Sequence, residues 1–307
     1  MNRRQFLKSM AVAVAGTAIT SKLKVTAAES LVQDGISAEL PDLVAVRNGE
    51  PIAMFRKGIE ALGGMQSFVK PEQKVIIKPN ISFDSAPERA ANTNPELVGE
   101  VVRQALAAGA KEVLVFDHTL SDWKTTYKVS GTQEAVEQAG GKMILADEKK
   151  FYINQKNVKA LKLQETDVFK PLLEADVFIN LPILKHHGGA KMSCAIKNLM
   201  GNVWDRRIMH RSDLNQCIAE MLFYTKPTLN IIDAYRIMIA NGPRGVSTDD
   251  VRLTKYMIIS TDIVAADVAA TKIIGYELDE VPYIKIAENL GFGKSDITKL
   301  NIARLEA

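Results

Sequence analysis

The sequence predicts an α/β fold with a mostly parallel sheet flanked by helices. Short apolar runs rich in β-branched residues alternate with segments that repeat apolar residues at helical spacing. This alternation is typical of parallel strands joined by helical crossovers. The 307 residues are 47% hydrophobic and 24% charged, which suits a large core and excludes disordered, collagen-like and coiled-coil chains. No repeat or break in composition divides the chain, so we expect one α/β domain over residues 42–307.

The strands are predicted from β-branched runs bounded by polar, glycine or proline residues. They cover residues 43–47, 74–78, 113–117, 177–181, 229–233 and 256–260. Weaker runs at residues 142–145 and 158–163 predict two further strands.

Helical spacing of apolar residues predicts six helices between these strands. They cover residues 51–63, 95–108, 132–139, 193–200, 213–224 and 263–274. Asn94 supplies a capping side chain before Pro95, which suits the first turn of a helix. Gly109, Gly140 and Gly275 stand where helices are expected to stop, because glycine readily adopts the left-handed conformation of a C-terminal cap.

The first 28 residues predict an export signal. Arg3-Arg4-Gln5-Phe6-Leu7-Lys8 precedes an apolar run at residues 10–20, and small residues at 25–28 offer a cleavage site. This pattern resembles a twin-arginine signal, with an ordinary secretory signal as the alternative. We therefore expect residues 29–41 to be a linker and the protein to be periplasmic or otherwise extracytoplasmic, delivered by the twin-arginine export machinery. The run is too short to span a bilayer, so no stable membrane anchor is expected after cleavage.

The positive charge of the chain lies in this predicted signal. The chain has 39 Lys and Arg against 36 Asp and Glu, and residues 1–28 hold five of the basic residues and no acid. The remainder therefore lacks a basic excess, and neither a nucleic-acid nor an anionic-membrane partner is expected. Cys194 and Cys217 are the two cysteines, too few for a four-thiolate iron–sulfur cluster, so none is expected. Their spacing leaves a disulfide between them open.

Polar residues recur directly after the predicted strands. In open parallel sheets ligands bind beyond the carboxyl ends of the strands, so these residues are candidates for one site. Each alone is typical of a solvated loop, whereas their recurrence favours a site that uses lysine and arginine to bind an anion. They are Lys78 and Asn80, Asp117 and His118, Lys185 to His187, Asp233, and Arg244 in a glycine-rich turn.

Histidine is concentrated in one part of the chain. It is both the usual acid or base near neutral pH and the commonest metal ligand. Ser193 and Lys197, followed by Asn198, share one face of the next predicted helix, whose start offers free N–H groups to an anion. The following Trp204-Asp205-Arg206-Arg207 is expected to be a solvated turn, with a position at the border of the pocket as the alternative. The clustered histidines are His186, His187 and His210.

These residues resemble the domain-of-unknown-function family 362 (DUF362) over most of the predicted mature chain. Some members of that family carry ferredoxin-like cysteine motifs, which this sequence lacks, so the resemblance implies no iron–sulfur cluster. It implies no established reaction either. The motifs are Lys78-Pro79-Asn80, residues 93–96, Asp117, Leu181-Pro182-Ile183-Leu184-Lys185, His187, Ser193, Lys197-Asn198, Gly201, Asp233 and Asn241-Gly242-Pro243.

The spacing His187-x5-Ser193-x3-Lys197 is similar to a stretch in nickel-dependent lactate racemases. In that family the lysine anchors a nickel-pincer nucleotide, and histidines bind nickel or act as acid and base at a 2-hydroxy acid carbon. The resemblance implies a metal ion or a nickel-pincer-like cofactor, with Lys197 as its tether. It further implies His118 and His187 as acid and base, and His210 as a nickel ligand with His187 as a second candidate.

Two functions fit these observations. The first is an exported enzyme, either racemase-like or isomerase-like or metal-dependent, in which His118 and His187 transfer protons on a small anionic substrate. The alternative is a non-catalytic periplasmic binding protein for an anionic ligand or a metal. Catalysis is favoured, because the sequence indicates no division into two hinged lobes. The candidates for binding the anion are Lys78, Asn80, Lys185, Ser193, Lys197, Asn198, Asp233 and Arg244.

Overall fold

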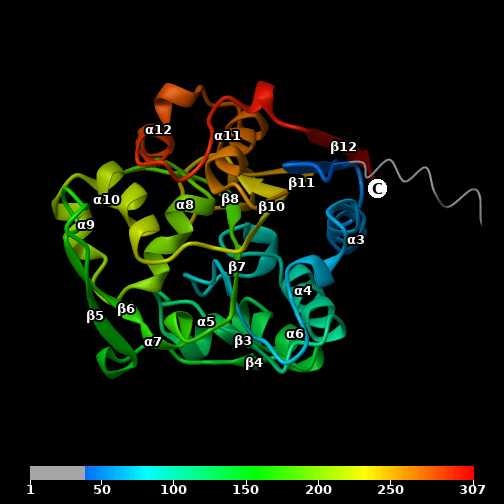
Figure 1. Ribbon diagram of the computed structural model, residues 1–307, viewed down its shortest axis with the longest axis horizontal. Helices are drawn as coiled ribbons and strands as arrows, with labels where there is room; N and C mark the ends of the chain where they lie inside the picture. The colour runs from blue at the N-terminus through cyan, green and yellow to red at the C-terminus, as the bar shows by residue number, and fades with distance from the viewer. Residues whose placement is uncertain (1–38) are drawn as a thin grey trace, which may run out of the picture. The chain divides into compact units, whose positions relative to one another are not determined.

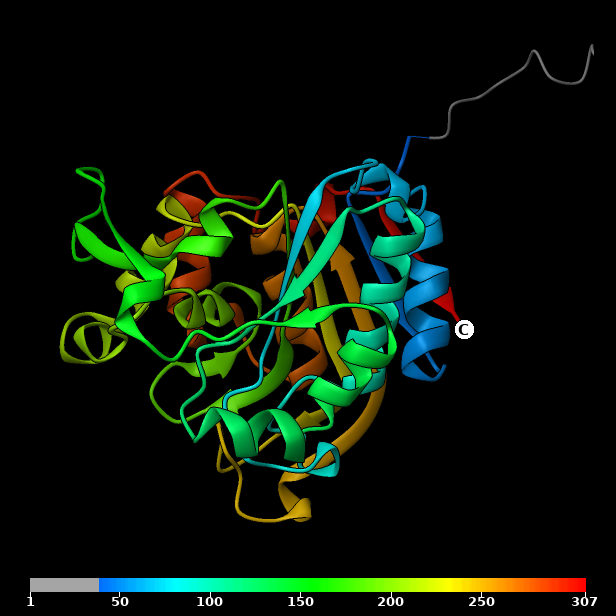
Figure 2. The ribbon, with the colours of Figure 1, turned by 90° about the horizontal axis from the view of Figure 1, so that it is seen from below.

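The computed structural model describes residues 39–307, in which Leu40–Ala307 form one compact unit. The predicted signal peptide and most of the predicted linker lie outside the described residues. A ten-stranded sheet runs through the unit, and helices lie on both of its sides (Figure 1, Figure 2). Within residues 39–307 no helix is long and apolar enough to cross a bilayer.

The main sheet is mostly parallel, as predicted. Its strands are β1 (Leu43–Arg47), β2 (Lys74–Pro79), β3 (Glu112–Val115), β4 (Lys142–Met143), β7 (Val177–Leu181), β8 (Ile183–His187), β9 (Lys191–Ser193), β10 (Leu229–Met238), β11 (Val251–Ser260) and β12 (Ile302–Glu306). They follow the order β12-β1-β11-β10-β7-β2-β3-β4, with β8 beside β10 and β9 beside β8. On the main path β11 runs antiparallel to both of its neighbours. β5 (Tyr152–Lys156) and β6 (Glu165–Phe169) form a separate antiparallel hairpin.

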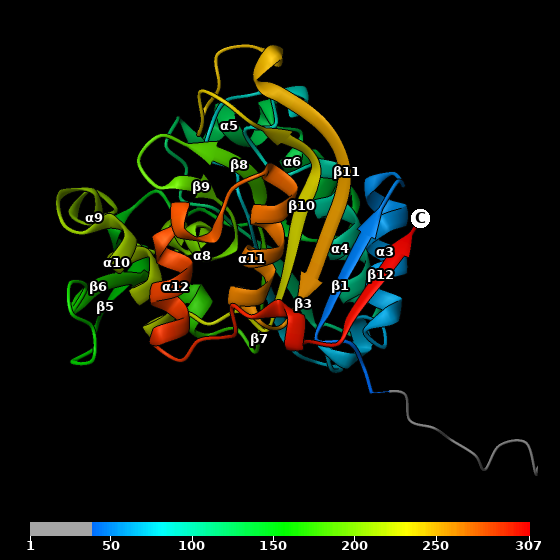
Figure 3. The same ribbon diagram turned by 90° about the horizontal axis from the view of Figure 1, so that it is seen from above.

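Two groups of helices cover the sheet (Figure 3). The first group consists of α3 (Pro51–Ala61), α4 (Pro95–Ala107) and α6 (Thr132–Gln138), with α5 (Trp123–Val129) beside α6. The second group lies on the opposite side and consists of α8 (Ala195–Asn198), α10 (Leu214–Glu220), α11 (Ile263–Ile274) and α12 (Pro282–Asn289). The short helices α7 (Lys170–Leu173) and α9 (Arg207–Arg211) complete the fold.

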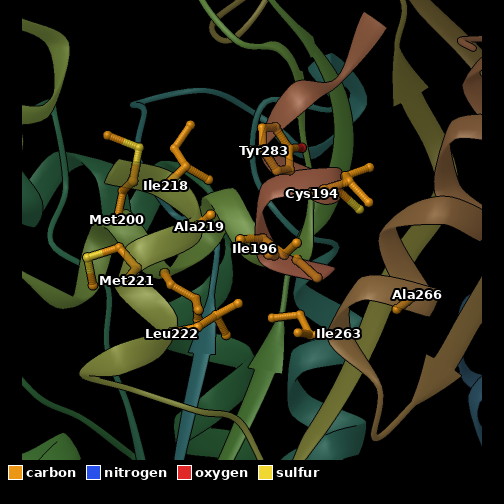
Figure 4. Close-up of a cluster of buried hydrophobic side chains, with 14 of the residues drawn as sticks. Cys194, Ile196, Met200, Ile218, Ala219, Met221, Leu222, Ile263, Ala266 and Tyr283 are labelled. Atoms are coloured by element: carbon orange, nitrogen blue, oxygen red, sulfur yellow. The ribbon is translucent and has the colours of Figure 1, made fainter. Parts of the chain in front are cut away.

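Successive residues of the central strands enter two hydrophobic cores. Val75 and Ile77 of β2 belong to the core under α3 and α4, whereas Ile76 belongs to the core on the other side. This alternation follows from the geometry of a strand, whose successive side chains point to opposite faces. Figure 4 shows the second core, where Ile196 of α8 and Ile218 of α10 lie among buried side chains. The sheet is therefore buried on both faces, and its strand ends remain to form a site.

Residues 158–163, predicted as a strand, form the turn of the β5–β6 hairpin instead. The Asn157 side chain accepts a hydrogen bond from the backbone N–H of Lys159 at 2.9 Å, which bends the chain at this point. Val158 and Leu161 are exposed, whereas Ala160 and Leu163 are buried. The prediction of a strand from this apolar run is therefore wrong, because only part of the run packs against the core.

Two further expectations about strands are wrong. β10 does not end at Asp233 but continues to Met238, paired with β11 along its length. Residues Ile183–His187, expected as a loop after β7, form the strand β8, and β9 extends to Ser193 before α8 begins at Ala195. Helix ends were predicted more closely: Asn94 caps α4 through Leu97 N–H, and Gly275 ends α11 with a φ of 86°.

Glu220, buried at the end of α10, holds the turn of the β5–β6 hairpin in place. Its carboxylate accepts hydrogen bonds from three consecutive backbone N–H groups. The donors are Leu161 at 2.6 Å, Lys162 at 3.0 Å and Leu163 at 2.7 Å. A charged acceptor thus satisfies donors that have no partner in the strand ladder.

Replacing Glu220 with alanine is expected to lower the free energy of unfolding by about 3 kcal/mol, because three N–H groups lose a charged acceptor. Urea unfolding followed by circular dichroism measures this change. Glu165→Ala is the control: its exposed carboxylate pairs with Lys156 at 3.4 Å, and its loss should leave the midpoint nearly unchanged. Equal midpoints for the two variants would contradict the role given to Glu220.

Candidate functional site

A cavity of about 440 Å³ lies at the carboxyl ends of β2 and β3 and beside β8. Its volume suits a small-molecule ligand. Residues from strand ends and from α8 to α9 form its walls, as parallel strands that end at one edge of a sheet allow. The polar lining includes Lys78, Asn80, Asp117, His118, Lys185, His187, Ser193, Lys197, Asn198, Arg206 and His210.

The structure brings together all the predicted site residues except Asp233 and Arg244. Asp233 lies within β10, and its buried carboxylate accepts hydrogen bonds from the N–H groups of Asn94 at 2.9 Å and Tyr235 at 3.1 Å. Burial raises the pKa of Asp233 to about 6. Arg244 is 62% exposed and pairs with Asp84 at 2.9 Å. Neither lines the cavity, so the structure does not bring these two residues together with the other candidates.

A buried ion pair forms the floor of the cavity. The ammonium of Lys78 lies 2.8 Å from a carboxylate oxygen of Asp117, and both side chains are 1% exposed. Lys78 also donates to Asn198 Oδ1 at 2.8 Å, and Asn80 donates to the same oxygen at 3.1 Å. Asn198 in turn donates to Asn180 at 2.9 Å. Lys78 and Asn198 are thus engaged within the protein, which favours a positioning role for them.

Three other buried or partly buried cations at the cavity lack a carboxylate partner. Lys185 is buried and donates to the Ala91 carbonyl at 2.5 Å, and the ammonium of Lys197 lies 3.4 Å from the sulfur of Met200. Arg206, partly buried, completes the set. Within residues 39–307 none of the three forms an ion pair. Buried charges are normally paired, so this arrangement favours an anionic ligand.

Burial lowers the pKa of both Lys185 and Lys197 to about 7. Neighbouring positive charges add to the effect: Lys197 acts on Lys185, and Arg206 and Lys78 act on Lys197. The amines of Lys185 and Lys197 therefore titrate close to neutral pH. A bound anion would favour the charged form of both lysines and raise their pKa values.

His118 presents an unprotonated ring nitrogen to a ligand. Its Nδ1 lies 3.0 Å from the carbonyl oxygen of Val203, which only accepts hydrogen bonds, so Nδ1 carries the proton. The lone pair of a neutral ring is then on Nε2. The ring stacks on Trp204 with centroids 5.2 Å apart. Burial and the charge of Arg206 lower the pKa of His118, which keeps the ring neutral.

His187 has the opposite tautomer. Its Nδ1 accepts hydrogen bonds from the backbone N–H groups of Gly189 at 3.0 Å and Ala190 at 3.1 Å, so Nδ1 is unprotonated and Nε2 carries the proton. Burial, with the positive charges of Lys197 and Lys185, lowers the pKa of His187 to about 3. His187 is thus a neutral hydrogen-bond donor rather than a base at neutral pH.

The donor set does not fit a resident metal ion. His187 and His210 lie together with ring centroids 6.4 Å apart, but the protonated Nε2 of His187 has no lone pair for a metal. No group of three or more His, Cys, Asp or Glu side chains in residues 39–307 is arranged to hold a metal ion. The geometry therefore argues against His187 and His210 as a metal site.

The structure also changes what was expected of the N–H groups at the start of α8 and of the two cysteines. The N–H groups at the start of α8 are not free. The carboxylate of Asp267 in α11 accepts hydrogen bonds from the N–H of Ala195 at 2.7 Å and from the N–H of Ile196 at 3.0 Å. These two N–H groups cannot bind a ligand anion. Cys194 and Cys217 are both buried free thiols rather than a disulfide.

The turn that follows α8 contributes to the cavity, which the sequence analysis gave only as the alternative for this segment. Trp204 and Arg206, expected in a solvated turn, line the cavity together with Asp205 and Arg207. Trp204 covers the ring of His118, and Arg206 donates to the carbonyl of Thr119 at 3.1 Å. The signal in the sequence that could have favoured this position is Trp204, which is followed by Arg206 and Arg207 shortly after Lys197 of α8.

The fold and the cavity define an α/β protein with a cationic strand-end site. The chain belongs to the domain-of-unknown-function family DUF362, whose pattern matches residues 75–272, as the sequence resemblance predicted. It is 28% identical to the thylakoid-associated protein sll1697 of Synechocystis sp. over 252 residues, 79% of this chain and 76% of that protein.

Solved structures similar to this chain include a lactate racemase apoprotein. That protein, from Thermoanaerobacterium thermosaccharolyticum, is 12% identical with a TM-score of 0.49, and the match covers 75% of this chain and 56% of that chain. A protein from Thermotoga maritima is 11% identical with a TM-score of 0.43, covering 74% of this chain and 60% of that chain. The chain thus spans less than two thirds of either solved structure.

Gly201→Ala is expected to lower the free energy of unfolding by about 2 kcal/mol. A methyl group at Gly201 would lie 2.4 Å from an oxygen of Asp117 and 2.6 Å from a carbon of Lys78, so the buried ion pair would have to shift. Gly188→Ala is the matched control, because its nearest atom would lie 4.0 Å away. Thermal unfolding of both variants measures the difference, and equal stability would contradict this packing.

Sulfate binding is expected to weaken about tenfold or more between pH 6 and pH 8.5. Lys185 and Lys197, with pKa values of about 7, are cationic below neutral pH and lose their charge above it. Calorimetric titration with sulfate at constant ionic strength measures this change, because sulfate keeps its own charge over the range. Lys197→Met should weaken binding at pH 6 and flatten the profile, whereas Lys170→Met, at an exposed ion pair with Glu174, should not. A pH-independent affinity would overturn the expectation.

Proposed function

We propose that this protein is an enzyme that transfers a proton on a small anionic molecule bound in the strand-end cavity. The observation that carries the proposal is the pair of histidines with opposite tautomers on one cavity that also holds unpaired cations. One ring can accept a proton and the other can donate a hydrogen bond. The anion of the substrate would meet Lys185, Lys197 and Arg206.

In this proposal His118 is the general base. Its Nε2 takes a proton from the substrate, and the carbonyl of Val203 stabilises the resulting imidazolium through Nδ1–H. The lowered pKa keeps the ring neutral, and therefore ready to accept, before the substrate arrives. Stacking on Trp204 fixes the plane of the ring. The same residue can return the proton to the reacting atom.

His187 stabilises the negative charge that develops when the proton leaves. Its Nε2–H can donate to a substrate oxygen, and its Nδ1 is held by two backbone N–H groups, so the ring cannot readily become cationic. A positioned neutral donor in a site partly shielded from water stabilises an oxyanion effectively. The role differs from the base predicted from sequence, because the backbone partners of the ring decide the tautomer.

A second candidate function is a non-catalytic binding protein for a small anion. The unpaired Lys185, Lys197 and Arg206 favour it, because they would suffice to hold an anion without any chemistry. For either function we propose that the protein works outside the cytoplasm after twin-arginine export. The supporting observation is Arg3-Arg4-Gln5-Phe6-Leu7-Lys8 followed by an apolar run.

The enzyme proposal is tested by hydrogen–deuterium exchange. The protein is incubated in D2O with small carboxylates that carry a hydroxyl, oxo or amino group beside the carboxylate, and exchange of the neighbouring C–H is followed by proton NMR. We expect catalysed exchange with at least one compound, and His118→Asn should slow it about 100-fold or more. His186→Gln, outside the cavity, should retain the activity.

The alternative outcomes separate the two functions. Tight sulfate binding without exchange of any compound would support the binding protein and contradict the enzyme. Exchange that survives His118→Asn would remove His118 as the base. Circular dichroism of each variant controls for loss of the fold.

A further inference from the structure

The turn of the β5–β6 hairpin, residues 157–164, presents apolar side chains to solvent. Val158 is 95% exposed and Leu161 is 68% exposed. The hairpin lies at the edge of the molecule in Figure 1 and Figure 3, and Figure 2 shows it standing out from the helices around it. The cavity of the candidate site does not involve this turn. The surface is a projecting tip (Figure 2), separate from that cavity.

The exposure of these side chains is built into the fold. Glu220 fixes the backbone of residues 161–163 by three hydrogen bonds, and Ala160 and Leu163 are buried beneath the turn. Asn157 further closes the turn by accepting from Lys159 N–H. These contacts hold Val158 and Leu161 in the same turn with their side chains exposed to solvent.

Positive charge surrounds the two apolar side chains. Lys156, Lys159 and Lys162 alternate with them, and residues 156–164 contain no acid. Lys156 pairs with Glu165, whereas Lys159 and Lys162 form no ion pair in the described part of the chain. A local basic and apolar tip thus exists on a chain whose part after residue 28 has no basic excess.

We propose that this tip docks reversibly on a bilayer surface rich in anionic lipid. Val158 and Leu161 would enter the interface between headgroups and acyl chains, while Lys159 and Lys162 pair with lipid phosphates. A projecting tip suits a bilayer, which needs no complementary groove, better than it suits a folded protein partner. The site is separate from the cavity, so the proposal does not depend on the proposed enzyme.

Vesicle flotation tests the proposal with a chain that begins at residue 29 and retains the compact unit Leu40–Ala307. The vesicles consist of phosphatidylcholine with about one third phosphatidylglycerol. We expect binding to these vesicles, little binding to pure phosphatidylcholine, and release at high salt. The double variant Val158→Ser with Leu161→Ser should lower the bound fraction about fivefold or more, and Lys159→Gln with Lys162→Gln should remove the dependence on phosphatidylglycerol.

Val246→Ser is the matched control, because Val246 is 74% exposed on another loop and should not matter. The variants lie at exposed positions, so their thermal unfolding should match that of the parent chain. Absence of binding to the anionic vesicles would overturn the proposal. Equal binding of the parent chain and the Val158 and Leu161 double variant would overturn it as well.

Discussion

The cavity depends on the buried ion pair between Lys78 and Asp117. Two charges can be buried only where they pair closely and their other hydrogen-bonding positions are satisfied. The side-chain oxygen of Asn198 accepts a hydrogen bond from the ammonium of Lys78, and the carboxylate of Asp117 accepts one from the backbone N–H of Ile81 at 2.7 Å. The pair joins the end of β2 to the second residue after β3, and Asn198 joins it to α8. Asp117 and Asn198 each have a cavity-lining neighbour in the chain, because His118 follows Asp117 and Lys197 precedes Asn198.

The two histidines illustrate how the backbone sets the chemistry of a side chain. The same ring meets a carbonyl oxygen at His118 and two N–H groups at His187, so the available Nε2 is an acceptor in one and a donor in the other. Both are kept neutral by burial and by nearby cations. The cations that bind an anion therefore also set the protonation state of the groups that would act on it.

Sequence reasoning predicted the sheet and most of the cavity because parallel strands bring their carboxyl ends to one edge. Lys78, His118 and His187 could be placed together on that ground alone. Asp233 was misplaced because nothing in the sequence marks where a long buried strand such as β10 ends. Arg206 was not among the predicted site residues, because its position depends on the irregular path of the chain after α8. The tautomers were likewise beyond prediction, since they depend on backbone groups that meet the rings only in the folded chain.

The adjacent histidines of β8 carry one more consequence. His187 lines the cavity, whereas the ring of His186 does not. Its Nδ1 accepts a hydrogen bond from the backbone N–H of Gly242 at 3.0 Å. A Cβ at position 242 would lie 1.9 Å from the carbonyl oxygen of His186, so no other residue permits this approach. Since neighbouring side chains of a strand face opposite ways, sliding β8 by one step against β9 would exchange the two imidazoles. Gly242 therefore permits a contact that holds the His186 ring away from the cavity, while the His187 ring faces a bound molecule.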